Sequence, residues 1–336
     1  MRSIAFAAAL AASAVVTSVS GQQPVGTIPL DPPPPPLVVD GVEVLKVQGQ
    51  VYLLAGGGAN VTAQIGDEGV LLADSGGAGQ ADRILNALRR VTTKPVRYLV
   101  NVNGDTDHVS GNDAIVKAGS GFRGPRPQQV GGGNPVGQNV GVMTVSHENA
   151  YNRMTQAPPN GAGLSGDALP GSTFFTPRKD IFANGEPIEL RYQPDAHSDG
   201  DIFVYFRKSD VVSVGDVFTP HSYPVIDLAR GGTVNGVIDA LNTIIEITVP
   251  ERNQMGGTRV IPGHGRIANE ADVVDYRDMV TIVRDRVQDM IKKGMTLQQI
   301  RAANVTLEYD GYYGAPSGPA SPGGFLEAVY RSLGGK

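Results

Sequence analysis

The chain of 336 residues contains no cysteine, and this absence excludes two kinds of structural support. Disulfide bonds cannot stabilise the fold, and thiolates cannot bind a metal ion. Any metal ion must therefore be held by His, Asp, Glu or Asn. The sequence offers five histidines for this purpose, which are His108, His147, His197, His221 and His264.

The sequence also lacks an excess of positive charge and, after its first twenty or so residues, any long hydrophobic run. A net charge of -5 and a pI near 5.6 give no electrostatic reason to expect a nucleic-acid partner. Hydrophobic residues make up 40% of the chain and charged residues 18%, as in ordinary globular proteins. We therefore expect a globular protein with a small-molecule substrate and no stable insertion into a membrane.

The first residues are typical of a secretory signal peptide. Arg2 gives a positive start, Ile4 to Val19 is an apolar run, and Ser18 to Gly21 supplies small residues for cleavage. A membrane anchor is the alternative, but a span needs roughly 20 strongly apolar residues. We predict a signal peptide at residues 1–21, a proline-rich linker at 22–37, one folded domain at 38–336, and a periplasmic or secreted location.

Short apolar runs at turn spacing predict strands in the first part of the folded region, and helical periodicity first appears at Ala81 to Val91. The glycines at 56–58 fit a hairpin turn rather than a phosphate loop, because no helix and no Lys-Ser/Thr pair follow. Gly-rich and Pro-rich segments at 119–138 and 157–172 are typical of surface loops. The predicted strands are 42–47, 51–55, 61–65, 69–73, 96–102, 140–146, 188–192, 202–206 and 211–214, and the later predicted helices are 234–247, 270–293, 296–303 and one starting at Ser321-Pro322.

Four potential metal ligands lie within six residues directly after the predicted strand at 96–102. They are Asn103, Asp105, Asp107 and His108. A helix and a strand precede them, so the sequence predicts a βαβ unit whose second strand ends in this cluster, where open α/β sheets place their sites. Gathering acidic side chains in this way is costly unless a cation lies among them.

Three further potential ligands also lie at strand boundaries. His197 precedes the strand at 202–206, Asp216 follows the strand at 211–214, and His264 follows the apolar segment Val260 to Pro262. Glycines beside them allow the backbone to approach closely. Each residue alone could be an exposed loop side chain, but together with the first cluster they predict a metal centre.

With these ligands, the chain resembles the metallo-β-lactamase-fold superfamily over roughly residues 42–333, and in particular its exported bacterial members. The segments that carry the resemblance are 72–76, 101–112, 196–201, 215–216 and 262–265, with 147–149, 223–227 and 328–333 similar to the exported members. The resemblance implies an α/β fold, an αββα sandwich of two mixed β-sheets flanked by helices. It also implies a centre for one or two divalent metal ions and hydrolysis of ester, thioester, amide (including β-lactam) or phosphodiester bonds.

The family motif His-x-His-x-Asp-His falls on Asn103 to His108, so both histidines of the first metal site are replaced. The resemblance implies a first site of Asn103, Asp105 and His197, and a second of Asp107, His108 and His264, with Asp216 bridging. An amide oxygen is a weak ligand for Zn²⁺, and a carboxylate favours harder ions such as Mn²⁺, Fe²⁺ or Mg²⁺. Three interpretations stay open: an enzyme using the second site alone, an enzyme with a harder or mixed metal pair, and a protein that has lost catalysis.

For an enzyme, the resemblance implies a metal-bound water as nucleophile, with Asp107 orienting this water and taking its proton. We expect Zn²⁺ as the cofactor, with Mn²⁺ or Fe²⁺ as alternatives. His221, in the loop after Asp216, is a candidate substrate-binding residue, whereas for His147 a structural hydrogen bond is expected. The alternative function is a non-catalytic metal-binding or ligand-binding protein on the same fold. An iron-dependent oxygenase is disfavoured, because the family's persulfide dioxygenases use the first-site imidazoles missing here.

Overall fold

The computed structural model describes residues 36–121, 141–156, 164 and 166–335. The predicted signal peptide and residues 22–35 of the predicted linker lie outside these residues, as do most of the predicted loop at 119–138 and half of the one at 157–172. The first described strand begins at Leu37, one residue before the predicted start of the folded domain.

The first sheet contains eight strands among the described residues, and their order in space follows their order in the chain. Its first five strands are antiparallel neighbours, of which β2 to β5 correspond to the four strands predicted between residues 42 and 73, and β5, β6, β7 and β8 then run parallel to one another. The strands are β1 (Leu37–Val39), β2 (Val42–Gln48), β3 (Val51–Ala55), β4 (Val61–Gly66), β5 (Gly69–Ala73), β6 (Val96–Val100), β7 (Met143–His147) and β8 (Ser172–Phe174).

The second sheet contains five strands in the described part of the chain, in the order β13-β12-β11-β10-β9. Strands β9 to β12 are antiparallel neighbours, and β13 joins β12 in parallel. The parallel pair places the ends of β12 and β13 at one edge of the sheet, so the residues after them lie close together. The strands are β9 (Arg178–Ala183), β10 (Glu186–Gln193), β11 (Asp201–Phe206), β12 (Val211–Gly215) and β13 (Arg259–Pro262).

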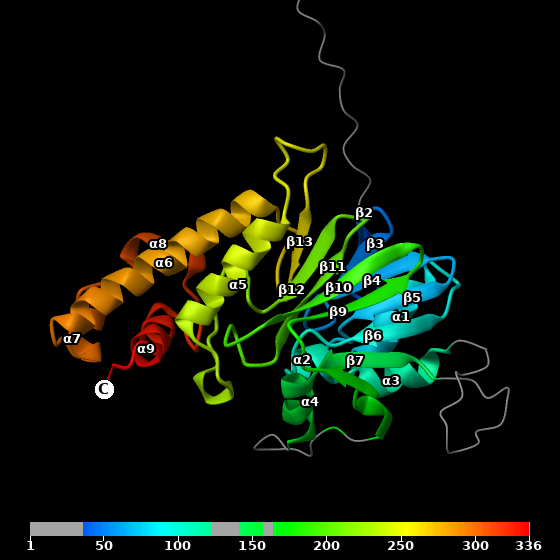
Figure 1. The fold of residues 1–336 in the computed structure, drawn as a ribbon, viewed down its shortest axis with the longest axis horizontal. Helices are drawn as coiled ribbons and strands as arrows, with labels where there is room; N and C mark the ends of the chain where they lie inside the picture. Colours follow the sequence, from blue (N-terminus) through cyan, green and yellow to red (C-terminus); the bar gives the residue numbers. More distant parts are fainter. Residues whose placement is uncertain (1–35, 122–140, 157–163, 165, 336) are drawn as a thin grey trace, which may run out of the picture. The chain divides into compact units, whose positions relative to one another are not determined.

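Helices cover the outer face of each sheet (Figure 1). Helices α1 and α3 pack on the first sheet, α5 and α6 pack on the second, and α9 packs against α5, α6 and α7. The described helices are α1 (Ala81–Arg89), α2 (Thr106–Val109), α3 (Asn112–Ala118), α4 (Glu148–Thr155), α5 (Val234–Ile247), α6 (Glu270–Lys292), α7 (Leu297–Ala302), α8 (Leu307–Tyr313), α9 (Pro322–Ser332) and the short 3-10 helices η1 (Gly166–Ala168) and η2 (Leu228–Arg230).

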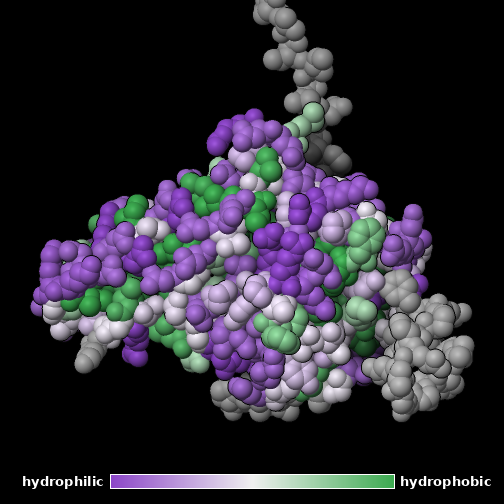
Figure 2. Space-filling model, viewed as in Figure 1, coloured by the Kyte–Doolittle hydropathy of each residue, from purple (hydrophilic) through white to green (hydrophobic). Residues whose placement is uncertain are grey.

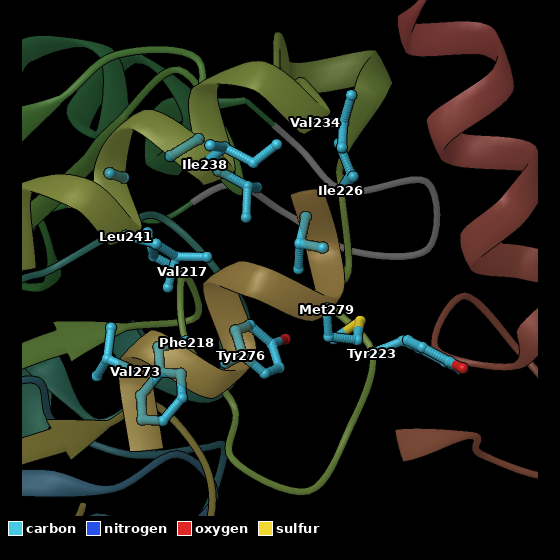
Figure 3. Packing of buried hydrophobic residues seen from close by; sticks show 14 of the residues in the cluster. Val217, Phe218, Tyr223, Ile226, Val234, Ile238, Leu241, Val273, Tyr276 and Met279 are labelled. Carbon is cyan, nitrogen blue, oxygen red and sulfur yellow. The ribbon is translucent and has the colours of Figure 1, made fainter. Parts of the chain in front are cut away.

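Alternating side chains of β11 fill two different cores, because successive residues of a strand point to opposite faces. Ile202 and Val204 pack between the two sheets, whereas Phe203 and Tyr205 pack against the helices. The helix-covered core includes Phe218 and Tyr276, whose rings meet edge to face at 5.1 Å (Figure 3). The predicted αββα sandwich of two mixed sheets is confirmed.

The described surface is polar over most of the face shown in Figure 2, and hydrophobic groups are exposed there in separate patches. Within residues 36–121, 141–156, 164 and 166–335, no helix has the length and apolar character that crossing a membrane requires.

Candidate metal centre

The loop after β6 carries four of the predicted ligands, and a short helix fixes their directions. Helix α2 begins directly after Asp105, and the His108 N–H donates to the Asp105 carbonyl over 3.0 Å. This turn points Asp107 and His108 toward the edge where β12 and β13 end. The predicted position of the cluster, at the carboxyl end of the second strand of a βαβ unit, is confirmed.

One group of potential ligands consists of Asp107, His108 and His264, whose ligand atoms all lie within 4.8 Å of one another. His264 Nε2 lies 2.9 Å from Asp107 Oδ2. The His108 side chain is fully buried, whereas the side chains of Asp107 and His264 are 43% and 44% exposed. The group therefore has a buried side and an open side.

Asp216 closes the buried side of this group. Its Oδ2 lies 3.0 Å from His108 Nε2, and its Oδ1 lies 3.6 Å from His264 Nε2. Within the described part of the chain, His108 Nε2 and Asp216 Oδ1 are both buried and form no well-directed hydrogen bond, although Nε2 lies 3.0 Å from Asp216 Oδ2. Leaving buried polar atoms unpaired is costly, and a divalent cation among these four residues would satisfy both. The residues present therefore fit a metal ion.

Gly263 allows this close arrangement. A Cβ at this position would lie 2.2 Å from Asp216 Oδ1 and 2.8 Å from the carbonyl carbon of Gly215. Only a residue without a side chain lets the β13 turn approach the carboxylate this closely.

Asp74 holds His108 from behind and was given no role by the sequence analysis. Its Oδ2 lies 2.7 Å from His108 Nδ1, and its Oδ1 accepts the Val102 N–H over 2.9 Å. A carboxylate at Nδ1 holds the ring proton there and leaves Nε2 free for a metal ion. Asp74 lies at the end of β5 and has a φ of 69°, which brings its side chain beside the ligand loop. In the sequence, Asp74 could have been noticed because it lies in segment 72–76, one of the segments that carry the family resemblance.

A second group consists of Asp105, His197 and Asp216, also within 4.8 Å of one another. His197 Nε2 lies 2.8 Å from Asp105 Oδ2, and His197 Nδ1 lies 2.8 Å from the Val225 carbonyl oxygen. The other oxygen of Asp105 accepts a hydrogen bond from Arg230 Nη1. Sequence reasoning missed Arg230, since no motif marks it.

Asn103 is buried beside both groups, and both the oxygen and the nitrogen of its side-chain amide form hydrogen bonds. Its Oδ1 accepts the Asp105 N–H over 3.0 Å, and its Nδ2 donates to Asp216 Oδ2 over 3.1 Å. The side chain thus turns its amino group toward the bridging carboxylate and its oxygen toward the backbone.

The carboxylates raise the pKa values of the neighbouring histidines, and the histidine His108 lowers the pKa of Asp216. Burial opposes the charged form of His108, but Asp216 and Asp74 raise its pKa well above the usual range. Burial likewise opposes a charge on His197, yet its hydrogen bond to Asp105 raises its pKa to about 10. Burial also opposes ionisation of Asp216, while His108 holds its pKa below the usual range. Without a metal ion, protons on the imidazoles supply the positive charge that the carboxylates need.

His147 and His221 belong to neither of these two groups. His147 Nδ1 accepts the Asn149 N–H over 3.2 Å and caps α4, which is the expected structural hydrogen bond. His221 is exposed and packs edge to face on Tyr312 of α8, with ring centroids 5.2 Å apart. A surface pocket of about 530 Å³ lies between the end of β10 and the start of α5, and none of the predicted metal ligands lines it.

The comparisons with known proteins agree with the fold. The sequence profile of the "Metallo-beta-lactamase superfamily" matches residues 54–264. No curated protein sequence matches this chain. Among solved structures, the inverting sec-alkylsulfatase Pisa1 from Pseudomonas sp. is similar with a TM-score of 0.59 at 17% identity, covering 86% of this chain and 49% of that chain. This chain thus spans about half the length of that sulfatase.

Two metallo-beta-lactamases are similar over nearly their whole length. The enzyme from Pontibacter korlensis gives a TM-score of 0.53 at 16% identity, covering 71% of this chain and 99% of that chain. DIM-1 gives a TM-score of 0.52 at 13% identity, with 72% and 98% covered. Likeness at this identity concerns the fold, while the sequence profile covers more than half of the chain. The chain therefore belongs to the metallo-beta-lactamase superfamily.

Proposed function

We propose that the protein is a metal-dependent hydrolase whose working divalent ion is held by Asp107, His108, His264 and Asp216. Membership of the superfamily supports a metal-dependent hydrolase at the family level. The observation that carries the proposal for this chain is the pair of buried atoms without a well-directed hydrogen bond, His108 Nε2 and Asp216 Oδ1. Both belong to the group that is open on its other side.

The buried His108 and the mostly buried Asp216 would hold the ion, and the partly exposed Asp107 faces the open side. Bound there, a divalent ion supplies Lewis acidity and lowers the pKa of a coordinated water from ~15.7 towards about 7. The hydrogen bond to His264 holds the pKa of Asp107 below its usual range, so this carboxylate is ionised at neutral pH. With 43% of its side chain exposed, Asp107 can orient a water on the open side and accept its proton.

The donor set favours Zn²⁺ as the ion. Two imidazoles with carboxylate oxygens are ordinary ligands for Zn²⁺, and Fe²⁺ or Mn²⁺ can use the same set. Asp74 orients the imidazole of His108 and raises its basicity as a metal ligand.

The proposed substrate is a small molecule with an ester, thioester, amide (including β-lactam) or phosphodiester bond. The similar structures include an alkylsulfatase and metallo-beta-lactamases, so a sulfate ester joins these candidates. All of these reactions develop negative charge on an oxygen, which a cation at the open side would stabilise.

The test uses purified protein stripped of metal and then reconstituted with Zn²⁺, Mn²⁺ or Fe²⁺. We expect turnover of at least one activated ester, thioester, phosphodiester, sulfate ester or β-lactam, and loss of that turnover in Asp107→Ala. Asp113→Ala is the matched control, since Asp113 lies on the surface of α3 and pairs with Lys117 at 2.7 Å. Absence of stoichiometric metal after reconstitution would sink the proposal.

The second candidate is a non-catalytic metal-binding or ligand-binding protein, which the replaced histidines at positions 103 and 105 favour. Asn103 and Asp105 stand where the superfamily motif has histidines, and both are engaged in hydrogen bonds of the fold. This candidate predicts stoichiometric metal without turnover of any of these substrates. Metal-dependent turnover that Asp107→Ala abolishes would exclude it.

We further propose that the protein is exported to the periplasm or secreted. The positive start at Arg2 and the apolar run from Ile4 to Val19 support this proposal. N-terminal sequencing of the protein from cell fractions is the test. A mature end near Gly21 in an exported fraction is expected, and an intact Met1 in the cytoplasm would contradict export.

A further inference from the structure

We propose that Arg230 takes the place of the first metal ion, so that the centre holds one divalent ion per chain rather than two. This inference rests on the proposed function and concerns the group of Asn103, Asp105 and His197. The resemblance to the superfamily implies a metal site there, but the side chains present do not fit one.

The carboxylate of Asp105 is already fully engaged. One oxygen accepts a hydrogen bond from Arg230 Nη1, and the other lies 2.8 Å from His197 Nε2. A divalent ion bound to this carboxylate would stand beside a guanidinium, which stays protonated under all ordinary conditions. The Arg230 charge therefore opposes an ion at this place.

Asn103 cannot replace the missing imidazole in its observed orientation. Its oxygen accepts the Asp105 N–H, and its amino group points at Asp216 Oδ2 over 3.1 Å. A metal ion would require the amide to turn over, which would break both hydrogen bonds and place the amino group where the backbone N–H now donates. The residue thus acts as a donor to the bridging carboxylate.

The backbone around Arg230 is built to hold it in this position. Arg230 ends the 3-10 helix η2, which Asp227 caps by accepting the Arg230 N–H over 3.1 Å, and Gly231 follows with a φ of 83°. The Arg230 carbonyl in turn accepts the Asp199 N–H over 2.8 Å. The Asp227 N–H donates to the His197 carbonyl over 2.9 Å. The loop that carries Arg230 is therefore joined to the loop that carries His197.

The charges of the centre balance in the same way. Arg230 lies against Asp105 and also 3.4 Å from Asp227, and Asp74 is paired with His108, so Asp107 and Asp216 remain to compensate one divalent ion. Among the described residues, the buried atoms without a well-directed hydrogen bond, His108 Nε2 and Asp216 Oδ1, belong to the place proposed for this ion. Both Asp105 oxygens and both His197 nitrogens, by contrast, have partners. A metal ion is therefore needed beside His108 and Asp216, whereas beside Asp105 the guanidinium of Arg230 already supplies the positive charge.

The experiment counts bound metal. Purified protein is equilibrated with excess Zn²⁺, freed of loosely bound ions by gel filtration and analysed by mass spectrometry for zinc per chain. Calorimetric titration of metal-free protein gives the affinity of each equivalent. We expect one equivalent in the wild type and in Arg230→Lys, and a second equivalent in Arg230→Gln that binds at least about tenfold more tightly than any second equivalent in the wild type.

Arg153→Gln is the matched control, because Arg153 forms a 2.7 Å ion pair with Asp199 nearby and is partly buried like Arg230. It should bind one equivalent. Two equivalents in the wild type, or one in a folded Arg230→Gln, would overturn the inference while leaving the proposed function standing. No equivalent in the wild type would overturn the proposed function itself. Should Arg230→Gln fail to fold, Arg230→Met serves as the uncharged variant, and the wild-type count decides independently.

Discussion

Replacing Asp74 by Asn tests whether the fold prepares His108 to bind a metal ion. The substitution keeps the shape of the side chain, the Oδ1 that accepts the Val102 N–H over 2.9 Å, and a residue type that tolerates a φ of 69°. Only the group facing His108 Nδ1 at 2.7 Å changes, from an anionic acceptor to an amide donor. The ring must then accept at Nδ1 and carry its proton on Nε2, the nitrogen that the ion needs.

The expected effect follows from the cost of losing such a partner. Removal of a carboxylate that orients a ligating histidine weakens metal affinity about 10- to 100-fold. This loss corresponds to about 1.4 to 2.8 kcal/mol of binding free energy. The metal-free fold should tolerate the change, because burial raises the pKa of Asp74 and the fold therefore already disfavours its charge.

The assay is competition for Zn²⁺ between the protein and a chromophoric chelator at neutral pH. Asp201→Asn is the matched control: Asp201 is also buried, but it accepts the Ser198 N–H over 2.6 Å and lies on the side of His197. Its variant should bind within about threefold of the wild type. An affinity of Asp74→Asn within about twofold of the wild type would refute the idea that His108 is prepared by its carboxylate partner.

Three further predictions address pH, packing and stability. The pKa of His197 is raised to about 10 in the metal-free fold, so the stability it contributes is fully present below its unfolded pKa near ~6.5 and is lost as pH rises towards the folded value. Urea unfolding with a chelator present should therefore give a falling free energy between about pH 7 and about pH 9.5, less steeply in His197→Gln; a rising free energy would contradict this. Gly263→Ala should weaken zinc binding at least about tenfold, because its Cβ would lie 2.2 Å from Asp216 Oδ1, whereas Gly311→Ala, with no atom within 4 Å, should leave binding unchanged. Phe325→Ala should destabilise the protein by about 3 to 5 kcal/mol in urea unfolding, since its fully buried ring anchors α9; a loss below about 1 kcal/mol would show that the helix is loosely attached.

Much of the fold could be predicted because its strongest elements carry clear periodic patterns. Strands β3 and β5 and helix α5 begin and end at the predicted residues. The short elements α2, α3 and α8 were not predicted, since they span few residues and have little periodicity. Strand β9 was also missed, because its first three residues, Arg178 to Asp180, are charged and only three apolar residues follow them.

The candidate site could be predicted as a set of ligands but not as a set of contacts. Six of the seven predicted ligands fall into the two observed groups, because each follows or precedes a recognisable strand. The partners of those ligands come from far along the chain: Arg230 reaches Asp105 across 125 positions, and Asp74 reaches His108 across 34. Contacts of this kind depend on how two sheets pack together, which no local pattern specifies.

The C-terminal helices also contact the loop after Asp216 across a long stretch of sequence, and no local pattern predicts this contact either. Tyr223 stacks on Phe325 of α9 with ring centroids 4.7 Å apart. Its hydroxyl also donates to Asp310 of α8 over 2.8 Å. The loop that carries His221 and Arg230 is therefore held by helices far from it in the sequence.

Asp216 takes part in both halves of the centre, and this makes the two halves thermodynamically dependent on each other. Its Oδ2 lies 3.1 Å from the Asn103 amino group and 3.0 Å from His108 Nε2. Any change that strengthens the hold of Asn103 on this carboxylate alters metal affinity at His108, and by reciprocity the bound metal alters the stability of the Asn103 contact by the same free energy. Substitutions in the two halves should therefore be non-additive. An Asn103→His substitution would consequently change the affinity for the ion at His108 as well as the contacts of Asn103 itself.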